Sequence, residues 1–439
     1  MSPNMMLDRT QQLKIHDIPY LPEPRAERLT LDNGIQLVML NSGDERVTRI
    51  TISWEGGLYE SSNPVASHLL AKLLKDCSPT LSPSEMADLL DSCGAWIASD
   101  IKSHHLVLSL YTINSQLDKV LPAIIDIINA PAVPAAETEM LKAQCASRRE
   151  LIGKKVTFKA QELENSRIFG SNHPAAFTPT AGDYFNVTVS EIQKLYNTQY
   201  RGLSPVVFIA GRIDPEIKDL IISQLNRIKT DKDKTVELTL TPFSPEAPGT
   251  QRVECPDSLQ SAVLISMPSI PRSHPDYETL RAVVVALGGY FGSRLMTVIR
   301  EEKGLTYGIS AALLGHREGS YITISSQCDN RYTNTVVEEI GKEIARLACE
   351  PMSEDELTTL KRYIRSNLAA SFDTPFSAMD YFTTQRHVGT PPDYLDRQQK
   401  ALDRLTPNVI MDFARKYLVE PDKYITIAGK KSDKNDDAK

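Results

Sequence analysis

The stretch from Leu287 to Leu314, LGGYFGSRLMTVIREEKGLTYGISAALL, contains two glycine turns that separate three elements. Gly288-Gly289 interrupts the apolar helix predicted before it, because glycine adopts backbone angles that other residues resist. Ser293 is a candidate N-cap for a short helix, and Gly304 fits the position just past the end of that helix. Residues 306–314 then alternate as a strand does. The stretch therefore predicts a helix, a short second helix and a strand, joined by glycine turns.

Two polar side chains fall on either side of the second glycine turn. Arg300 lies in the last turn of the short helix and Tyr307 at the start of the strand, so we expect them close in space. A guanidinium and a phenol are both hydrogen-bond donors, and together they could stabilise negative charge on a peptide carbonyl oxygen during hydrolysis. The same spacing also fits a structural role, in which Arg300 complements the helix C-terminus and Tyr307 packs at the edge of the core.

The composition indicates a soluble globular protein of more than one domain. The chain has 439 residues, 41% of them hydrophobic and 24% charged, with a net charge of −7. No dense Lys/Arg block offsets this charge, which argues against nucleic-acid binding. No apolar run approaches the roughly 20 residues of a membrane span, and the N-terminal residues lack the apolar core of a signal peptide. We therefore expect no membrane span and a cytoplasmic location, with a periplasmic one as the alternative if a signal peptide was omitted. The six cysteines are scattered without a CxxC pair, which is typical of reduced thiols.

Several segments recur in the same order at a nearly constant spacing. SHHLVLSL at residue 103 matches GSYITISS at 319, and VVFIAG at 206 matches YITIAG at 424. Such a repeat predicts two homologous α+β halves, residues 27–228 and 250–430, joined by a polar linker at 229–249. We expect each half to be a mostly antiparallel sheet covered by helices, and the two halves to form a clamshell. Ligand sites favour such domain interfaces.

Two further features have alternative interpretations. His104 and His105 are adjacent on a predicted strand, so they should face opposite sides, one toward the core and one toward solvent. The strand predicted near residues 95–99 could receive an extended peptide by strand addition, or Trp96 within it could be a core residue.

The first half resembles the pitrilysin/insulinase-type zinc peptidases, whose first helix carries the inverted metal motif H-x-x-E-H. The helix PVASHLLAKLLKDCS follows a strand and a Gly-Gly turn, as it does in that family. His68 occupies the first histidine position, but Ala71 replaces the catalytic glutamate and Lys72 the second histidine. The family's third ligand would fall near residues 148–150, where Glu150 is the candidate. This degenerate metal motif lacks the ligands and the base that zinc hydrolysis requires, so we expect no metal in this chain.

The second half resembles the substrate-binding region of the same family. That family uses an arginine and a tyrosine seven residues apart, and Arg300 and Tyr307 occupy these positions. The resemblance implies that Gly288, Gly289 and Ser293 belong to the substrate-binding loop, and it favours the functional interpretation of the pair.

In two-chain members of the family, one subunit keeps the metal motif and the other keeps only the Arg/Tyr pair. The resemblance therefore implies a non-catalytic, substrate-engaging subunit of a heterodimeric zinc endopeptidase, inactive alone. Its partners would be a homologous HxxEH-bearing subunit, which would hold the zinc, and a peptide substrate. The alternatives are a structural family member, like the core subunits of respiratory complexes, and a peptide-binding protein without peptidase activity.

Overall fold

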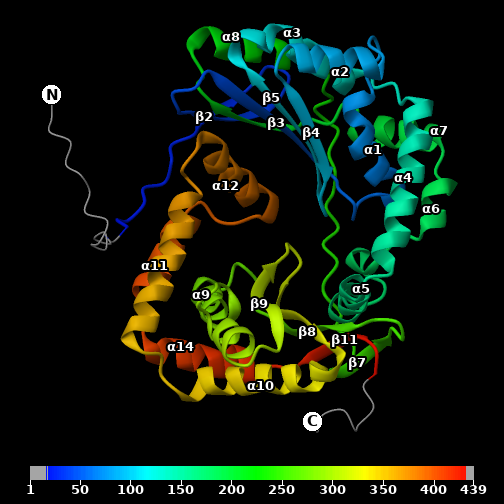
Figure 1. The fold of residues 1–439 in the computed structure, drawn as a ribbon. Helices are drawn as coiled ribbons and strands as arrows, with labels where there is room; N and C mark the ends of the chain where they lie inside the picture. Colours follow the sequence, from blue (N-terminus) through cyan, green and yellow to red (C-terminus); the bar gives the residue numbers. More distant parts are fainter. Residues whose placement is uncertain (1–15, 17, 432–439) are drawn as a thin grey trace, which may run out of the picture.

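A computed structural model describes residue 16 and residues 18–431, and its strands form two sheets (Figure 1). The first sheet has the order β1 (Glu27–Thr30), β2 (Gln36–Asn41), β6 (Val206–Gly211), β3 (Val47–Glu55), β5 (His105–Ile113) and β4 (Trp96–Ile101). The second has the order β7 (Gly249–Glu254), β11 (Tyr424–Gly429), β8 (Gln260–Ser269), β10 (Ser320–Asp329) and β9 (Thr306–Gly315). Each sheet contains one parallel pair, β2 with β6 and β7 with β11, and is otherwise antiparallel. The predicted α+β fold with two helix-covered sheets is confirmed.

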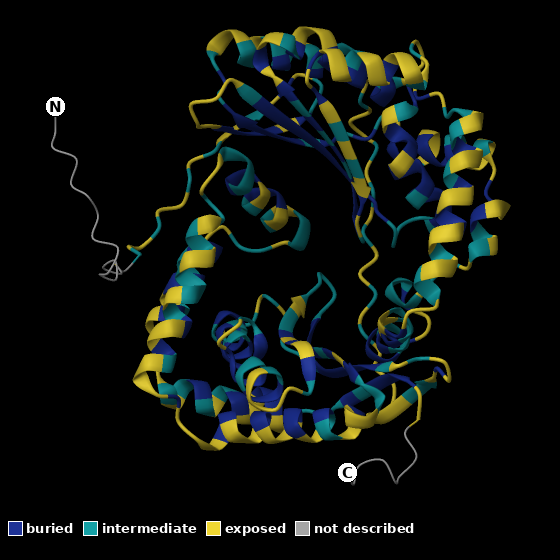
Figure 2. Ribbon diagram, viewed as in Figure 1, coloured by how far each residue is buried: buried dark blue, intermediate teal, exposed yellow. Residues whose placement is uncertain are grey.

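Helices cover one face of each sheet and bury its apolar side chains. The first half contributes α1 (Pro64–Leu73), α2 (Pro83–Ser92), α3 (Leu117–Asn129), α4 (Ala135–Gly153), α5 (Val156–Phe169), α6 (Ala181–Asn186), α7 (Val189–Leu195) and α8 (Pro215–Leu225). The second half contributes α9 (Tyr277–Gly288), α10 (Thr333–Cys349), α11 (Glu354–Ala370), α12 (Pro375–Val388), α13 (Tyr394–Asp403) and α14 (Pro407–Ala414). Helices α1, α3, α7 and α8 pack on the first sheet, and α9, α10 and α14 on the second. Figure 2 shows the strands of both sheets largely buried.

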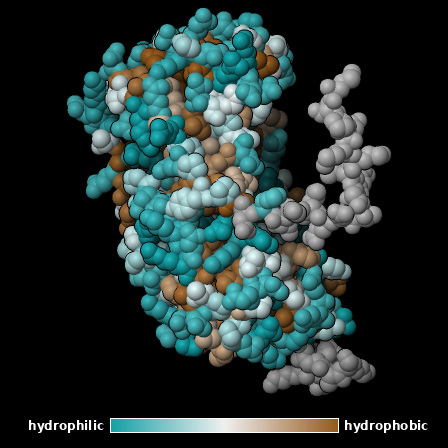
Figure 3. Space-filling model, turned by 90° about the vertical axis from the view of Figure 1, so that its left-hand side faces the viewer, coloured by the Kyte–Doolittle hydropathy of each residue, from teal (hydrophilic) through white to brown (hydrophobic). Residues whose placement is uncertain are grey.

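The two halves exchange one helix each across the space between them. Helix α12 leaves the second half and packs Ala378, Met379 and Phe382 against the free face of the first sheet. Helix α5 leaves the first half and packs Val156 and Ala160 against the free face of the second sheet. This exchange buries apolar surface on both sides and fixes how the halves sit on one another. From the side on which α11 lies, the halves form one continuous surface (Figure 3).

Buried polar contacts accompany the exchanged helices. Arg49 of β3 lies 2.7 Å from the carboxylate of Asp380 in α12 and donates to the carbonyl oxygen of Phe376 at 2.9 Å. Arg167 of α5, fully buried, donates to the carbonyl oxygens of Ile425 at 2.8 Å and Gly249 at 2.7 Å. Buried guanidinium groups need such partners, so these contacts also specify the docking of each helix.

A buried ion cluster joins the halves directly. The His104 ring contacts Glu60 through Nδ1 at 2.6 Å and Glu318 of the second half through Nε2 at 2.5 Å. The side chains of His104, Glu60 and Glu318 are 4%, 6% and 1% exposed. Burial alone would lower the pKa of His104, but the hydrogen bonds to Glu318 and Glu60 outweigh it and raise the pKa to about 9. The ring is therefore an imidazolium that bridges two carboxylates.

The expectation that one of His104 and His105 faces solvent is wrong. His105 is 3% exposed and stacks on His387 of α12 with ring centroids 4.1 Å apart. The two rings do point to opposite faces of the strand, but α12 covers the second face.

Among the helices that the structure describes, none combines the length and the apolar composition of a transmembrane span.

Candidate functional site

The segment with two glycine turns in the second half, residues 287–314, is formed as the sequence predicts, and its residues 296–314 are called the hairpin below. Helix α9 ends at Gly288, a π-helical segment (η5, Met296–Glu302) follows, and β9 begins at Thr306. Gly304 has a φ of +62°, so it reverses the chain in a backbone conformation that favours glycine. Arg300 therefore lies in the last turn of η5 and Tyr307 at the second position of β9.

A bulge at the start of β9 turns Tyr307 outward. Thr306 pairs with Cys328 and Ile309 with Ser326, so Tyr307 and Gly308 together face the single residue between these partners. The Thr306 hydroxyl supports the bulge, accepting from the Gly308 amide at 3.1 Å and donating to the Gln327 carbonyl at 2.7 Å. Bulges re-aim side chains next to sites of function. The Tyr307 side chain is 91% exposed, which excludes the alternative in which it packs at the core edge.

The Arg300 guanidinium is held by a ring rather than by a carboxylate. Its Cζ lies 4.8 Å from the centroid of the Phe291 ring, and the Phe291 side chain is itself 61% exposed. Within the described residues, the guanidinium has no hydrogen-bond or ion-pair partner. A cation–π contact fixes the position of a guanidinium and leaves its five N–H donors available.

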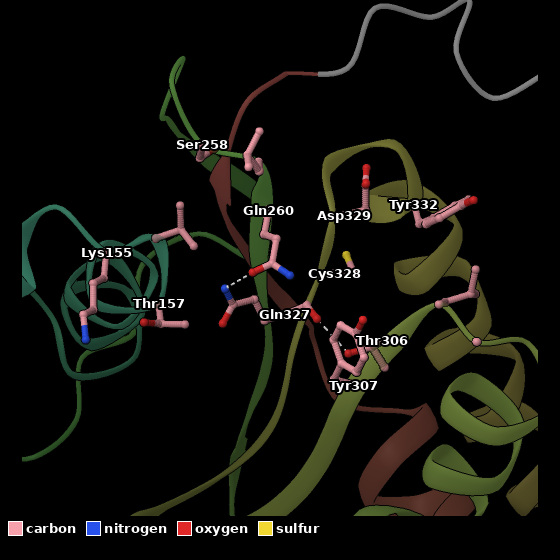
Figure 4. A pocket seen from close by; sticks show the side chains of 14 residues that line it. Lys155, Thr157, Ser258, Gln260, Thr306, Tyr307, Gln327, Cys328, Asp329 and Tyr332 are labelled. Atoms are coloured by element: carbon pink, nitrogen blue, oxygen red, sulfur yellow. Dashed lines mark hydrogen bonds between the residues drawn. The ribbon is translucent and has the colours of Figure 1, made fainter.

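Tyr307 stands at the rim of a pocket between β9 and the start of α5. The pocket has a volume of about 980 Å³, and Figure 4 shows Lys155 and Thr157 of the first half across it from Tyr307. Gln327 donates to Gln260 at 2.6 Å between these two sides. Thr157 and Gln327 also line a second hollow of about 500 Å³ along residues 308–310 of β9. Arg300 lines neither, so only one member of the predicted pair faces this groove.

Strand β9 also has one open edge. Strand β9 stands last in the order of its sheet, with β10 as its one strand partner among the described residues. An edge strand presents unpaired N–H and C=O groups that can pair with an extended peptide. In the first sheet, β4 is likewise an edge strand. Trp96 of β4 is 58% exposed and stacked 4.5 Å from Tyr111, so it is not a core residue.

The glycines and serine of the predicted substrate-binding loop lie behind the hairpin. Gly288 is buried against β9, Gly289 accepts a hydrogen bond from the Tyr363 hydroxyl at 3.3 Å, and Ser293 is 1% exposed. Ser293 precedes η5 as predicted, but its hydroxyl has no hydrogen-bond partner among the described residues and does not cap the helix. In this structure these three residues support the hairpin from within. Their contact with substrate stays a prediction.

Gly288→Ala should displace the hairpin. A Cβ at this position would lie 2.7 Å from the amide nitrogen of Ala311, which is a backbone atom that cannot move alone. Overpacking of this kind costs about 1–3 kcal/mol, so we expect a lower free energy of unfolding in urea. Gly341→Ala on α10, where a Cβ meets no atom within 4 Å, is the matched control and should not destabilise the chain. Equal stability of both variants would contradict the close approach.

The degenerate metal motif lies on α1, and its surroundings disfavour a cation. His68 is half-buried, Ala71 is 2% exposed and Lys72 is exposed. Burial lowers the pKa of His68, and the charges of Lys72 and Arg148 lower it further against an opposing effect of Asp100. That aspartate is itself paired with a lysine, Lys102. These groups therefore repel a positive charge near the imidazole.

The residues of the motif do not form a zinc site. Glu150, the candidate third ligand, is exposed on α4. Within residues 18–431, no three His, Cys, Asp or Glu side chains are grouped so that they could hold a metal ion. Zinc requires about three such ligands and an activated water, which His68 among two cations does not provide.

His68 and Tyr307 line different cavities. His68 faces an apolar pocket of about 490 Å³, together with Tyr184 of the first half and His316 and Tyr321 of the second. Tyr307 faces the groove along β9. The chain therefore does not bring the two motifs into one site of its own.

Known proteins similar to this chain are related to the M16 peptidases. Residues 186–364 match the family model described as the peptidase M16 inactive domain. The chain is 21% identical over 370 residues to an uncharacterized zinc protease of Mycobacterium leprae, covering 80% of each chain. It is also 21% identical over 394 residues to a Helicobacter pylori protein called a non-peptidase homolog, covering 86% of this chain and 88% of that one.

A solved structure shows the same fold. The peptidase M16 inactive domain from Pseudomonas fluorescens superposes with a TM-score of 0.80 at 18% identity, over 92% of this chain and 98% of that one. The two-sheet clamshell fold is thus shared with a solved peptidase M16 inactive domain. The chain is similar to proteins named as zinc proteases, and its residues 186–364 match the family model described as the peptidase M16 inactive domain.

Proposed function

We propose that this chain is the non-catalytic, substrate-engaging subunit of a heterodimeric zinc-dependent endopeptidase. The observation that carries the proposal is the presentation of Tyr307. A bulge holds its phenol 91% exposed at the rim of a groove between β9 and α5, and β9 is an edge strand of its sheet. A phenol that is exposed in this way adds little to the stability of the chain, whereas its hydroxyl can donate a hydrogen bond to a bound peptide.

The subunit would contribute donors, and its partner the metal. When bound in the partner, zinc activates a water molecule that attacks the scissile carbonyl. Tyr307 would provide a neutral hydrogen-bond donor and Arg300 a cationic one. Donors of these two kinds stabilise the oxyanion that forms in this attack. The peptide itself would lie extended, with its backbone paired to the edge of β9.

The chemistry of α1 supports the assignment of zinc to the partner. Ala71 supplies no base, and Lys72 and Arg148 oppose a cation beside His68. The partner should therefore be a homologue that carries the complete HxxEH motif.

Reconstitution tests this proposal. We expect the purified chain alone to cleave no unstructured peptide, and a 1:1 mixture with an HxxEH-bearing homologue from the same genome to cleave it. A chelator should abolish the cleavage and leave the melting temperature of the isolated chain unchanged. Cleavage by the isolated chain that a chelator removes would refute the proposal, and so would the failure of every such homologue to form an active pair.

A second candidate is a structural or peptide-binding family member without peptidase activity. The buried cluster of His104, Glu60 and Glu318 ties the halves together, which suits a rigid scaffold. The name of the Helicobacter pylori relative also fits this candidate. Peptide binding by the isolated chain, or its recovery in a larger complex without an HxxEH-bearing subunit, would favour it.

A further inference from the structure

A cavity separate from the three pockets described above lies where α9, α11, α12 and α13 meet. Its volume is about 360 Å³, within the range of small-molecule sites. Tyr381 and Thr384 of α12 form one wall, while another side of α12 packs on the first sheet. The cavity therefore lies within the second half, beside the helix that docks on the first half.

Two acceptor oxygens in this cavity lack donors. Glu278 of α9 is 4% exposed; one carboxylate oxygen, Oε2, contacts Arg281 at 3.1 Å, while Oε1 has no hydrogen-bond partner among the described residues. Gln398 of α13 is 8% exposed, and its Oε1 is likewise without a partner there. A buried acceptor without a donor is costly, so both oxygens favour a ligand that donates hydrogen bonds.

A cation at the same cavity lacks an anion. Arg272 lines the cavity and donates to the Tyr394 hydroxyl at 3.2 Å and to the Gly315 carbonyl at 3.3 Å, both of which are neutral. Among the described residues it has no carboxylate partner. Guanidinium groups in this situation bind carboxylates well, because the planar N–H donors match the two oxygens.

One side of the cavity is apolar. Its aliphatic residues are Ala282, Val285, Ile364, Leu368 and Leu402. A ligand that fits the whole cavity therefore combines an anion, a hydrogen-bond donor and an aliphatic group. The exposed residues Asn367 and Thr384 lie at its edge and provide a route to solvent.

We propose that this cavity binds a free α-amino acid with an aliphatic side chain. The carboxylate pairs with Arg272, the ammonium donates to Glu278 Oε1 and Gln398 Oε1, and the side chain contacts the apolar wall. The ligand pairs Arg272 and both unpartnered acceptor oxygens at once, which neither a simple carboxylate nor a simple amine can do.

Titration calorimetry of the intact chain with L-valine tests the proposal. We expect saturable binding to a single site. Isovalerate, which lacks the ammonium, and isobutylamine, which lacks the carboxylate, should each bind at least about tenfold more weakly. No saturable heat from L-valine or L-leucine at about 10 mM would overturn the proposal and leave buried water as the occupant.

Variants locate the site. Glu278→Gln and Arg272→Gln should each weaken L-valine binding about tenfold or more. Because Glu278→Gln also loses an ion pair and its folding could suffer, Gln398→Leu serves as a second variant that removes one acceptor and should weaken binding too. Arg365→Gln, on α11 but paired with Asp403 on the surface, is the matched control and should bind normally. Unchanged binding in folded Arg272→Gln and Gln398→Leu would place the ligand elsewhere and overturn the assignment.

Discussion

Replacing Arg300 by Ala or Tyr307 by Phe is expected to lower the turnover of the assembled peptidase by roughly 100-fold or more, the usual effect of removing an oxyanion donor. The effect should fall on kcat, because donors that act on the tetrahedral oxyanion contribute little to binding of the ground-state peptide. Steady-state kinetics on a fluorogenic peptide, with the reconstituted pair, measures both constants.

The structure also predicts that these variants fold and assemble. Tyr307 is 91% exposed, and the Arg300 guanidinium has a cation–π contact with Phe291 but no hydrogen bond or ion pair among the described residues, so neither substitution breaks a buried polar contact. The melting temperature and the 1:1 stoichiometry should therefore match those of the unmodified chain. Arg404→Ala, at an exposed position, is a control for loss of a surface guanidinium. Turnover unchanged in both Arg300→Ala and Tyr307→Phe would remove the proposed role of the pair.

The second large effect is expected at the buried ion cluster. His104→Ala leaves the carboxylates of Glu60 and Glu318, 6% and 1% exposed, without their counter-charge. Breaking a buried pair in this way costs about 3–5 kcal/mol. Because Glu318 belongs to the second half, the loss should loosen the contact between the halves. Urea unfolding measures the free energy, and hydrogen exchange of β5 and β10 reports the contact.

The pH dependence of this cluster follows from the direction of each pKa shift. The folded pKa of His104 is raised from 6.5 to about 9, so its contribution is complete below the unfolded pKa and is lost as pH rises through about 9. Burial opposes ionisation of Glu318, but the hydrogen bond from His104 outweighs it and lowers the pKa below 4.5. The contribution of Glu318 is therefore complete above 4.5 and is lost as pH falls through its folded pKa.

The cluster should stabilise the fold most between about pH 4.5 and 6.5, and roughly 2 kcal/mol should be lost between about pH 7 and 10. His104→Ala should flatten this alkaline decline, whereas His16→Ala, at an exposed position, should not. A decline of the same size in His104→Ala would show that other groups cause it.

The local sequence predicted the helices, strands and turns. It also showed that α1 lacks the side chains that bind zinc and activate water. Asp32-Asn33-Gly34 predicts the turn between β1 and β2, and Gly34 has the expected positive φ of +85°. Gly304 marks the end of the short helix in the same way. The replacements at Ala71 and Lys72 are visible without any structure, because a zinc ligand is a property of the side chain itself.

Tertiary structure alone decided which residues meet. His104 pairs with Glu318, 214 positions away, and α12 covers the face on which His105 was expected to be exposed. The outward aim of Tyr307 depends on a bulge set by the register of β9 against β10, which alternation of residue types cannot encode. Hydrophobic periodicity reports which face of an element is buried, but not which distant element buries it. The docking of α5 and α12 and the buried charges therefore emerge only when the two halves pack together.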